Sequence, residues 1–101
     1  MKRNWDDVRD VLIEVEELND EGRTEFAYRA DAADAKAKAK ADHAILLHQA
    51  GFIEGHLVEH LVGPRHFLSP KLTWAGHDLL ETIRSKAVWE RIKTAAKDKG
   101  H

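Results

Sequence analysis

A predicted strand passes directly into a predicted helix at Leu72-Thr73-Trp74-Ala75-Gly76-His77, the stretch that decides the fold of this chain. The residues before Thr73 are strand formers, and the Thr73 hydroxyl is a typical N-cap for the helix that follows. Apolar side chains then recur with helical spacing, and Trp89 lies beside them (Leu79, Leu80, Ile83, Ala87 and Val88). The sequence therefore predicts one long helix from residue 74 toward the C-terminus.

A β-hairpin is predicted immediately before this junction. Residues 52–54 and 57–62 are rich in strand-forming side chains, and Gly63-Pro64 is a turn signal. Residues 67–68 and 71–74 offer the returning strand. Pro70 has no backbone N–H to donate, so we expect it at an edge or at a bulge.

The first part of the chain predicts a helix followed by a short strand. Four apolar residues with helical spacing form the stripe of the helix (Val8, Val11, Val15 and Leu18). Asn4 is a good N-cap, and residues 19–22 have the composition of a turn. Phe26 and Tyr28 then alternate as in a short strand, although the run is brief.

The segment from residue 35 to residue 50 predicts one helix, or two helices separated by a short break. It begins with an alternating Ala/Lys repeat over residues 35–41, and both residue types favour helix. Asp31 or Asp34 can supply the N-cap. Gly51 is a natural residue to end the helix, because it tolerates a left-handed conformation.

Together these elements predict a single domain over residues 1–101, of the α+β class and mostly helical. The expected order is a helix, a short strand, two helices, a β-hairpin and a long C-terminal helix. A helix pair followed by a hairpin and a closing helix is typical of the winged helix-turn-helix. The length leaves room for one core only.

The composition excludes several classes of protein. The chain has no cysteine, which excludes disulfides and thiolate metal sites. No apolar run approaches the roughly 18 residues of a membrane span, and no secretory signal is recognisable. We therefore expect a cytoplasmic protein without a membrane partner. The net charge of −2 gives no electrostatic argument for nucleic acid.

Three stretches of the sequence resemble a known family. They are Met1-Lys2-Arg3-Asn4-Trp5-Asp6, Leu47-His48-Gln49-Ala50-Gly51-Phe52-Ile53-Glu54 and Leu72-Thr73-Trp74-Ala75-Gly76-His77-Asp78-Leu79-Leu80. The chain is similar there to short bacterial and phage proteins grouped as domain of unknown function 2513. The resemblance implies a winged-helix-like fold and no catalytic residues. The Ala/Lys repeat departs from the more varied polar residues expected of that family.

Binding of duplex DNA is the first functional hypothesis. With Leu47 on the core side of its helix, the outward side carries Lys38, Asp42, Ile45 and Gln49. The candidate DNA contacts are Lys36, Lys38 and Lys40 for phosphates, Gln49 for a base edge, and Arg65 and His66 at the hairpin tip. Such a protein would be a small regulator, expected to act as a homodimer.

Binding of a protein partner is the alternative hypothesis. On the outward side of the same helix, Asp42 would repel a phosphate backbone and Ile45 would expose an apolar side chain. Both features suit a protein surface better than a DNA-reading face. A second copy of the chain, or the target of a phage accessory or anti-defence factor, would be such a partner.

No motif in the sequence predicts an enzyme. His56-Leu57-Val58-Glu59-His60 matches the inverted zinc-peptidase signature, but that chemistry needs a substantial helix and this segment has strand character. We therefore expect no catalytic residue, no metal and no cofactor. Trp5, Trp74 and Trp89 are expected to pack in the core or in a dimer rather than to stack on bases.

Overall fold

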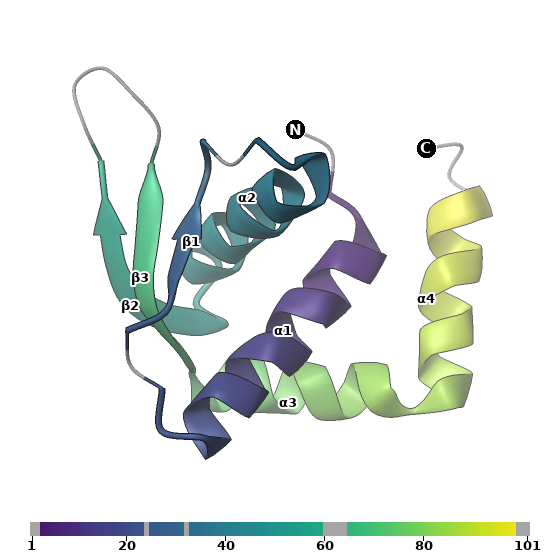
Figure 1. Ribbon diagram of the computed structural model, residues 1–101. Helices are drawn as coiled ribbons and strands as arrows, with labels where there is room; N and C mark the ends of the chain where they lie inside the picture. The colour runs from purple at the N-terminus through teal and green to yellow at the C-terminus, as the bar shows by residue number, and fades with distance from the viewer. Residues whose placement is uncertain (1–2, 24, 32, 60–64, 99–101) are drawn as a thin grey trace.

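The structure is a computed structural model that describes residues 3–23, 25–31, 33–59 and 65–98. It confirms the α+β class and a mostly helical chain (Figure 1). The elements follow in the order α1 (Trp5–Asp20), β1 (Ala27–Arg29), α2 (Ala35–Gln49), β2 (Ile53–Val58), β3 (His66–Leu72), α3 (Trp74–Arg84) and α4 (Lys86–Asp98). Among the described residues, none of the helices combines the length and apolar character needed to cross a membrane.

The three strands form one antiparallel sheet in the order β1-β3-β2. The predicted hairpin is confirmed, and its turn at Gly63-Pro64 lies outside the described residues. β3 occupies the centre, which leaves one edge of β1 and one edge of β2 unpaired within this sheet. α1 and α2 lie to one side of the sheet (Figure 1). Phe67 of β3 is fully buried in the same core cluster as residues of both helices.

Pro70 lies in the central strand, and a bulge explains how it is tolerated. Glu54 pairs with Lys71 and His56 pairs with Leu68, so the ladder between β2 and β3 is irregular beside the proline. The side chain of Asn19, near the end of α1, donates to the Pro70 carbonyl (3.0 Å) and accepts from the Leu72 N–H (3.2 Å). The end of α1 is thereby fixed to β3, and the expectation of a bulge is confirmed.

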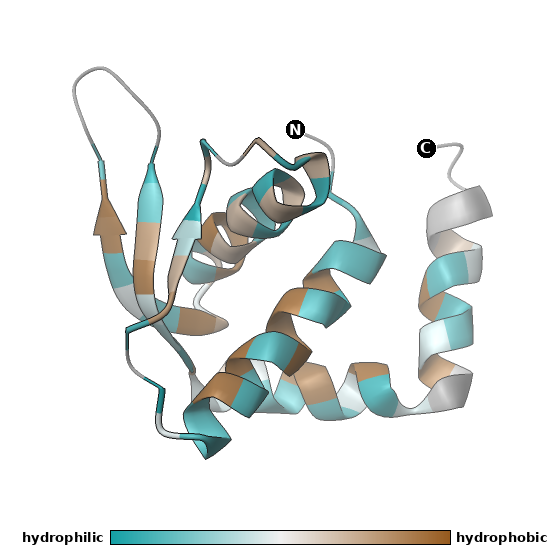
Figure 2. Cartoon of the chain, in the orientation of Figure 1, coloured by the Kyte–Doolittle hydropathy of each residue, from teal (hydrophilic) through white to brown (hydrophobic). Residues whose placement is uncertain are grey.

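The core lies where α1, α2, α3 and the sheet meet. Figure 2 shows apolar bands along α1 and α3 that alternate with hydrophilic ones, as expected for helices with one buried side. The largest fully buried side chains come from all of these elements (Phe67, Leu12, Ile45, Ile53, Leu80, Ile83, Val8, Val11 and Val15). Burial of these side chains, at about 1.5–3 kcal/mol each, supplies most of the stabilisation that opposes chain entropy.

A buried histidine joins the start of α1 to α2. The Asn4 backbone N–H donates to Nε2 of His43 (2.8 Å), and Nδ1 of His43 lies 2.7 Å from the Ala39 carbonyl. The Asn4 side chain itself accepts from the backbone N–H groups of Asp6 and Asp7, which confirms it as the N-cap of α1. These contacts set the position of α1 against α2.

Of the two alternatives for residues 35–50, the single helix is confirmed, and the expected order with two helices before the hairpin is wrong. Residues 35–49 form the single helix α2, with Asp34 as N-cap and a left-handed Gly51 (φ +87°) after its end. Only five residues separate β1 from α2, too few for another helix of ordinary length. The Ala/Lys repeat is part of α2, so its low complexity does not make it a linker.

The prediction of one long C-terminal helix is also wrong. Ser85 takes an extended conformation (φ −63°, ψ 120°) that ends α3, and its carbonyl accepts the N–H of Trp89 (2.8 Å) as α4 begins. α4 therefore runs in a different direction from α3 (Figure 1). The turn brings Trp89 into the core beside Arg9 of α1, whose guanidinium lies 5.1 Å from the indole centroid. That burial gives a physical reason for the break.

Candidate functional site

The free edge of β1 offers backbone hydrogen-bonding groups to a partner. On the paired side, Ser69 donates to the Phe26 carbonyl (2.9 Å) and Ala30 donates to the Arg65 carbonyl (3.1 Å), with Tyr28 opposite Phe67 between them. Backbone groups alternate in direction along an antiparallel strand. The N–H and C=O groups of Ala27 and Arg29 therefore turn away from β3, toward the free edge.

Two open hollows border β1 along its length. The first, of about 490 Å³, is lined by Gly22, Arg23, Glu25, Phe26 and Ala27. The second, of about 320 Å³, is lined by Glu14, Phe26, Ala27, Tyr28, Arg29, Ala37 and Lys40. They share Phe26 and Ala27, so the surface is hollowed from before the start of β1 to its end. We call this surface, made of β1 and the two hollows, the β1 edge groove.

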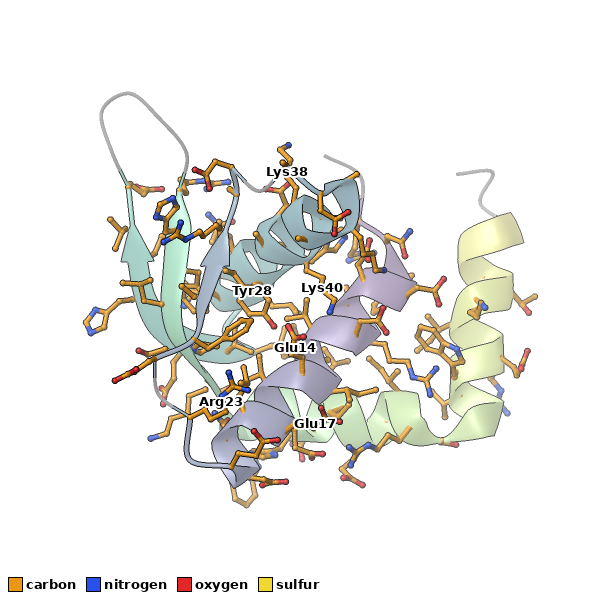
Figure 3. All side chains as sticks on the ribbon, viewed as in Figure 1. Glu14, Glu17, Arg23, Tyr28, Lys38 and Lys40 are labelled. Atoms are coloured by element: carbon orange, nitrogen blue, oxygen red, sulfur yellow. The ribbon has the colours of Figure 1, made fainter. Side chains whose placement is uncertain are left out.

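A polar cluster of three residues forms one wall of the groove. The Tyr28 hydroxyl donates to Oε1 of Glu14 (2.7 Å), and Nζ of Lys40 lies 3.1 Å from Oε2 of the same carboxylate. Figure 3 shows these three labelled side chains close together between β1, α1 and α2. Burial, together with the bond to Glu14, raises the pKa of Tyr28 far above its ordinary value of 10.0. The phenol therefore stays protonated, and the cluster holds β1 in place rather than offering a free nucleophile.

The outer face of β1 carries two opposite charges. Glu25 and Arg29 are both exposed, and they lie on the face opposite to the buried Tyr28. Neither side chain has an ion-pair partner among the residues that the structure describes. Two unpaired charges at a strand edge are available to a partner.

The three candidate phosphate-binding lysines of α2 are each paired with carboxylates. Nζ of Lys36 lies 2.6 Å from Asp7 and 3.3 Å from Asp10 of α1, and these hydrogen bonds raise the pKa of Lys36. Lys40 is bound by Glu14, as described above. Lys38 lies 3.8 Å from Asp42, one turn further along α2. Carboxylates of α1 thus pair with Lys36 and Lys40, and a carboxylate of α2 itself pairs with Lys38.

The candidates near the hairpin tip also face carboxylates. The guanidinium of Arg65 lies 3.8 Å from Glu59, and the ring of His66 lies 3.6 Å from Asp31. Gln49, the remaining candidate, is exposed near the end of α2. Five of the six candidates therefore lie in separate ion pairs with carboxylates, and the sixth, Gln49, carries no charge.

The prediction that Ile45 faces outward is wrong. Its side chain is only 1% exposed, because α2 packs against α1 on one side and against the sheet on another. A helix packed on two sides buries more than one narrow stripe, so both Leu47 and Ile45 lie in the core. Leu46 is the partly exposed apolar residue instead, and Asp42 is partly exposed beside Lys38.

The three tryptophans have different environments. Trp89 is in the core and Trp5 is half-buried, which agrees with the expectation of packing. Trp74, the first residue of α3, is 84% exposed, so it does not pack in the core of this chain. Its exposure follows from its place at the helix start, where the buried residue of the first turn is Gly76.

The zinc-peptidase motif is not assembled as its chemistry requires. His56 lies in β2, on an exposed position, and His60 lies outside the described residues. No group of three or more metal-ligating side chains comes together in the part of the chain that the structure describes.

Sequence reasoning did not single out Glu14, Tyr28, Glu25 or Arg29 as site residues. Alternation of Phe26 and Tyr28 was the available signal, because it predicted the short strand on which the groove is built. It gave no indication that this strand lies at an edge of the sheet.

The family resemblance is confirmed by comparison with known proteins. A model of the family described as "Hypothetical protein (DUF2513)" matches residues 2–101. An uncharacterised protein of Haemophilus influenzae is 33% identical over 99 residues, which cover 98% of this chain and 81% of the relative. No solved structure matches. Because the family model covers nearly every residue, this chain belongs to the DUF2513 family.

Proposed function

We propose that this chain is a protein-binding module that takes up an extended strand of its partner at the β1 edge groove. The observation that carries the proposal is the free edge of β1, which is bordered on its whole length by hollowed surface. Main-chain hydrogen bonds to an exposed sheet edge give affinity in strand addition, and pockets for alternate side chains give specificity. The groove offers both kinds of contact.

The charge distribution supports a protein partner over duplex DNA. Five of the six candidate DNA contacts lie within 4.0 Å of a carboxylate of the same chain. A phosphate backbone would have to displace those carboxylates before it gained the lysines and the arginine, and affinity for DNA depends on such contacts. A peptide strand does not have to displace these carboxylates, since it forms its hydrogen bonds with the backbone of β1.

The proposal is tested with a peptide of residues 25–31, acetylated and amidated at its ends, added to the ¹⁵N-labelled chain. We expect saturable shifts of the amide signals of Ala27 and Arg29, because these groups turn to the free edge. The amide of Tyr28 faces β3 and should shift less. A matched control peptide carries proline at the position of Ala27, which removes one donor from the added strand. Equal effects of the two peptides, or no shifts at millimolar peptide, would contradict strand addition.

A second candidate function is duplex DNA binding on a winged-helix scaffold. Two observations favour it: α2 is followed directly by the β2–β3 hairpin, as a recognition helix is followed by a wing, and Lys38 and Gln49 are exposed on α2. A salt titration against random duplex separates the two functions. A DNA binder loses affinity with a steep log–log slope set by the phosphates that it contacts. We expect no binding at low salt.

A further inference from the structure

We infer that the strand that adds to the β1 edge groove is β1 of a second copy of this chain. The inference rests on the proposed function and names its partner. Two copies related by a two-fold axis would join their sheets through antiparallel β1 strands, giving the continuous order β2-β3-β1-β1-β3-β2. Such a contact is isologous, because the same edge is used on both copies.

The sequence around β1 is complementary to itself when it is reversed. The alternation of the strand places Glu25, which lies just before β1, on the outer face with Ala27 and Arg29. In an antiparallel pair centred on Ala27, Glu25 of each copy lies opposite Arg29 of the other. The unpaired charges of Glu25 and Arg29 then each meet an opposite charge, which is the arrangement that stabilises cross-strand pairs.

The register also satisfies the backbone. Ala27, Glu25 and Arg29 share the alternation in which N–H and C=O groups turn to the free edge. Ala27 would therefore exchange two hydrogen bonds with its counterpart, and Glu25 would do the same with Arg29 of the other copy. A register shifted by one residue would lose these bonds. The backbone hydrogen bonds and the opposite charges thus both favour the antiparallel register centred on Ala27.

The charges of Glu25 and Arg29 cannot neutralise each other within one chain. Four residues of extended strand separate them by about 13 Å, well beyond ion-pair distance. Both side chains are exposed and have no ion-pair partner within the described part of the chain. Their complementarity is realised only between two strands.

Aromatic residues support the same pairing on the inner face. Phe26 is partly buried and its ring lies 4.9 Å from that of Tyr28, edge to face. In the two-fold register, Phe26 of each copy lies opposite Tyr28 of the other, in a pair whose side chains approach closely. Because Tyr28 is already buried in its own chain, the exposed part of the Phe26 ring is what the second copy would cover.

The other free edge of the sheet is less suited to pairing. The ladder of β2 with β3 is irregular between Glu54 and His56, because the single residue Gly55 (φ +159°) faces two residues of β3, and the Leu68 carbonyl lies 2.6 Å from the place that a Cβ of Gly55 would take. Bulges twist an edge away from regular pairing and protect it from added strands. β1 is short but regular over its whole register with β3.

The test is a charge reversal measured by sedimentation equilibrium of the full chain. The single variants Glu25→Arg and Arg29→Glu place like charges opposite each other in the dimer, and each should weaken the association by about tenfold or more. The double variant Glu25→Arg/Arg29→Glu restores opposite charges and should return the dissociation constant to near that of the wild type. Both positions are exposed, so the fold of each variant should be retained and is checked by circular dichroism.

A control reverses a charge of the same kind elsewhere. Glu54 is exposed on β2, and Glu54→Arg should leave the association unchanged. A wild-type chain that is monomeric at millimolar concentration would overturn the inference, as would a dimer that the single variants do not weaken. If the peptide of residues 25–31 still binds in either case, strand addition stands and only the identity of the partner is wrong.

Discussion

The substitution Gly76→Ala tests how α3 is docked on the start of β2. A Cβ at Gly76 would lie 1.9 Å from the carbonyl oxygen of Phe52, a backbone atom that cannot move aside as a side chain would. The same carbonyl accepts the N–H of Thr73 at 3.2 Å. α3 would therefore have to shift away from residue 52, and the hydrogen bond at its N-cap would be strained or lost.

The magnitude follows from three opposing contributions. Overpacking of this kind costs about 1–3 kcal/mol, and a lost backbone hydrogen bond costs about 1 kcal/mol. Alanine in a helix gains about 1 kcal/mol over glycine. The free energy of unfolding should therefore fall by about 2 kcal/mol for Gly76→Ala.

Urea unfolding followed by circular dichroism measures this change. The variant Ala75→Gly, at the exposed neighbouring position, measures the helix-propensity contribution alone and should cost about 0.5–1 kcal/mol. If Gly76 did not lie close to the Phe52 carbonyl, helix propensity alone would make Gly76→Ala more stable than the wild type. A stabilised or unchanged variant would refute the docking geometry.

Two further substitutions test the polar cluster and the corrected face of α2. Tyr28→Phe removes the hydroxyl that donates to Glu14 and should lower the free energy of unfolding by about 1 kcal/mol at neutral pH. The folded chain keeps the Tyr28 proton above pH 10.0, whereas the unfolded chain loses it. Above that pH, the free energy of unfolding of the wild type should therefore fall by about 1.4 kcal/mol more per pH unit than that of Tyr28→Phe. Equal slopes for the two proteins would contradict the raised pKa of Tyr28. Ile45→Ala should cost about 2–5 kcal/mol in urea unfolding, since Ile45 is fully buried. Leu46→Ala should lower the free energy of unfolding by less than half as much. A larger effect of Leu46→Ala than of Ile45→Ala would indicate that Ile45 faces outward.

Local signals predicted the ends of the elements well. Asn4, Asp34 and Thr73 each accept a backbone N–H as N-caps, and Gly51 follows α2 with a positive φ. These features depend on residues adjacent in the chain, so the sequence carries them directly. The strand-to-helix junction at Thr73 was predictable for the same reason.

Tertiary packing decided the features that the sequence did not show. Ser85 interrupts the C-terminal helix without a glycine or a proline, because the turn allows Trp89 to reach the core. Ile45 is buried because α2 is covered from two sides. The spacing of apolar residues on a helix predicts one buried face only, so it could not show a second one. The predictions of a continuous C-terminal helix and of an outward Ile45 were both wrong because each depends on packing against other parts of the chain.

The candidate site was hidden for a similar reason. The opposite charges of Glu25 and Arg29 are visible in the sequence, but they indicate a binding edge only once β1 is known to lie at a free edge of the sheet. Lys36 and Lys40 of α2 suggested phosphate contacts because their carboxylate partners lie far away in the chain, on α1. The edge position of β1 and the ion pairs between α1 and α2 are the reasons why the candidate site lies at β1 rather than on α2.

Amide hydrogen exchange at Ala27 tests the pairing of β1 most directly. Exchange is measured by NMR at two protein concentrations that lie well below and well above the dissociation constant. We expect the Ala27 amide to become more protected as concentration rises, while the Tyr28 amide, which faces β3, exchanges at the same rate in both samples. An Ala27 amide that exchanges equally fast at both concentrations would contradict the account.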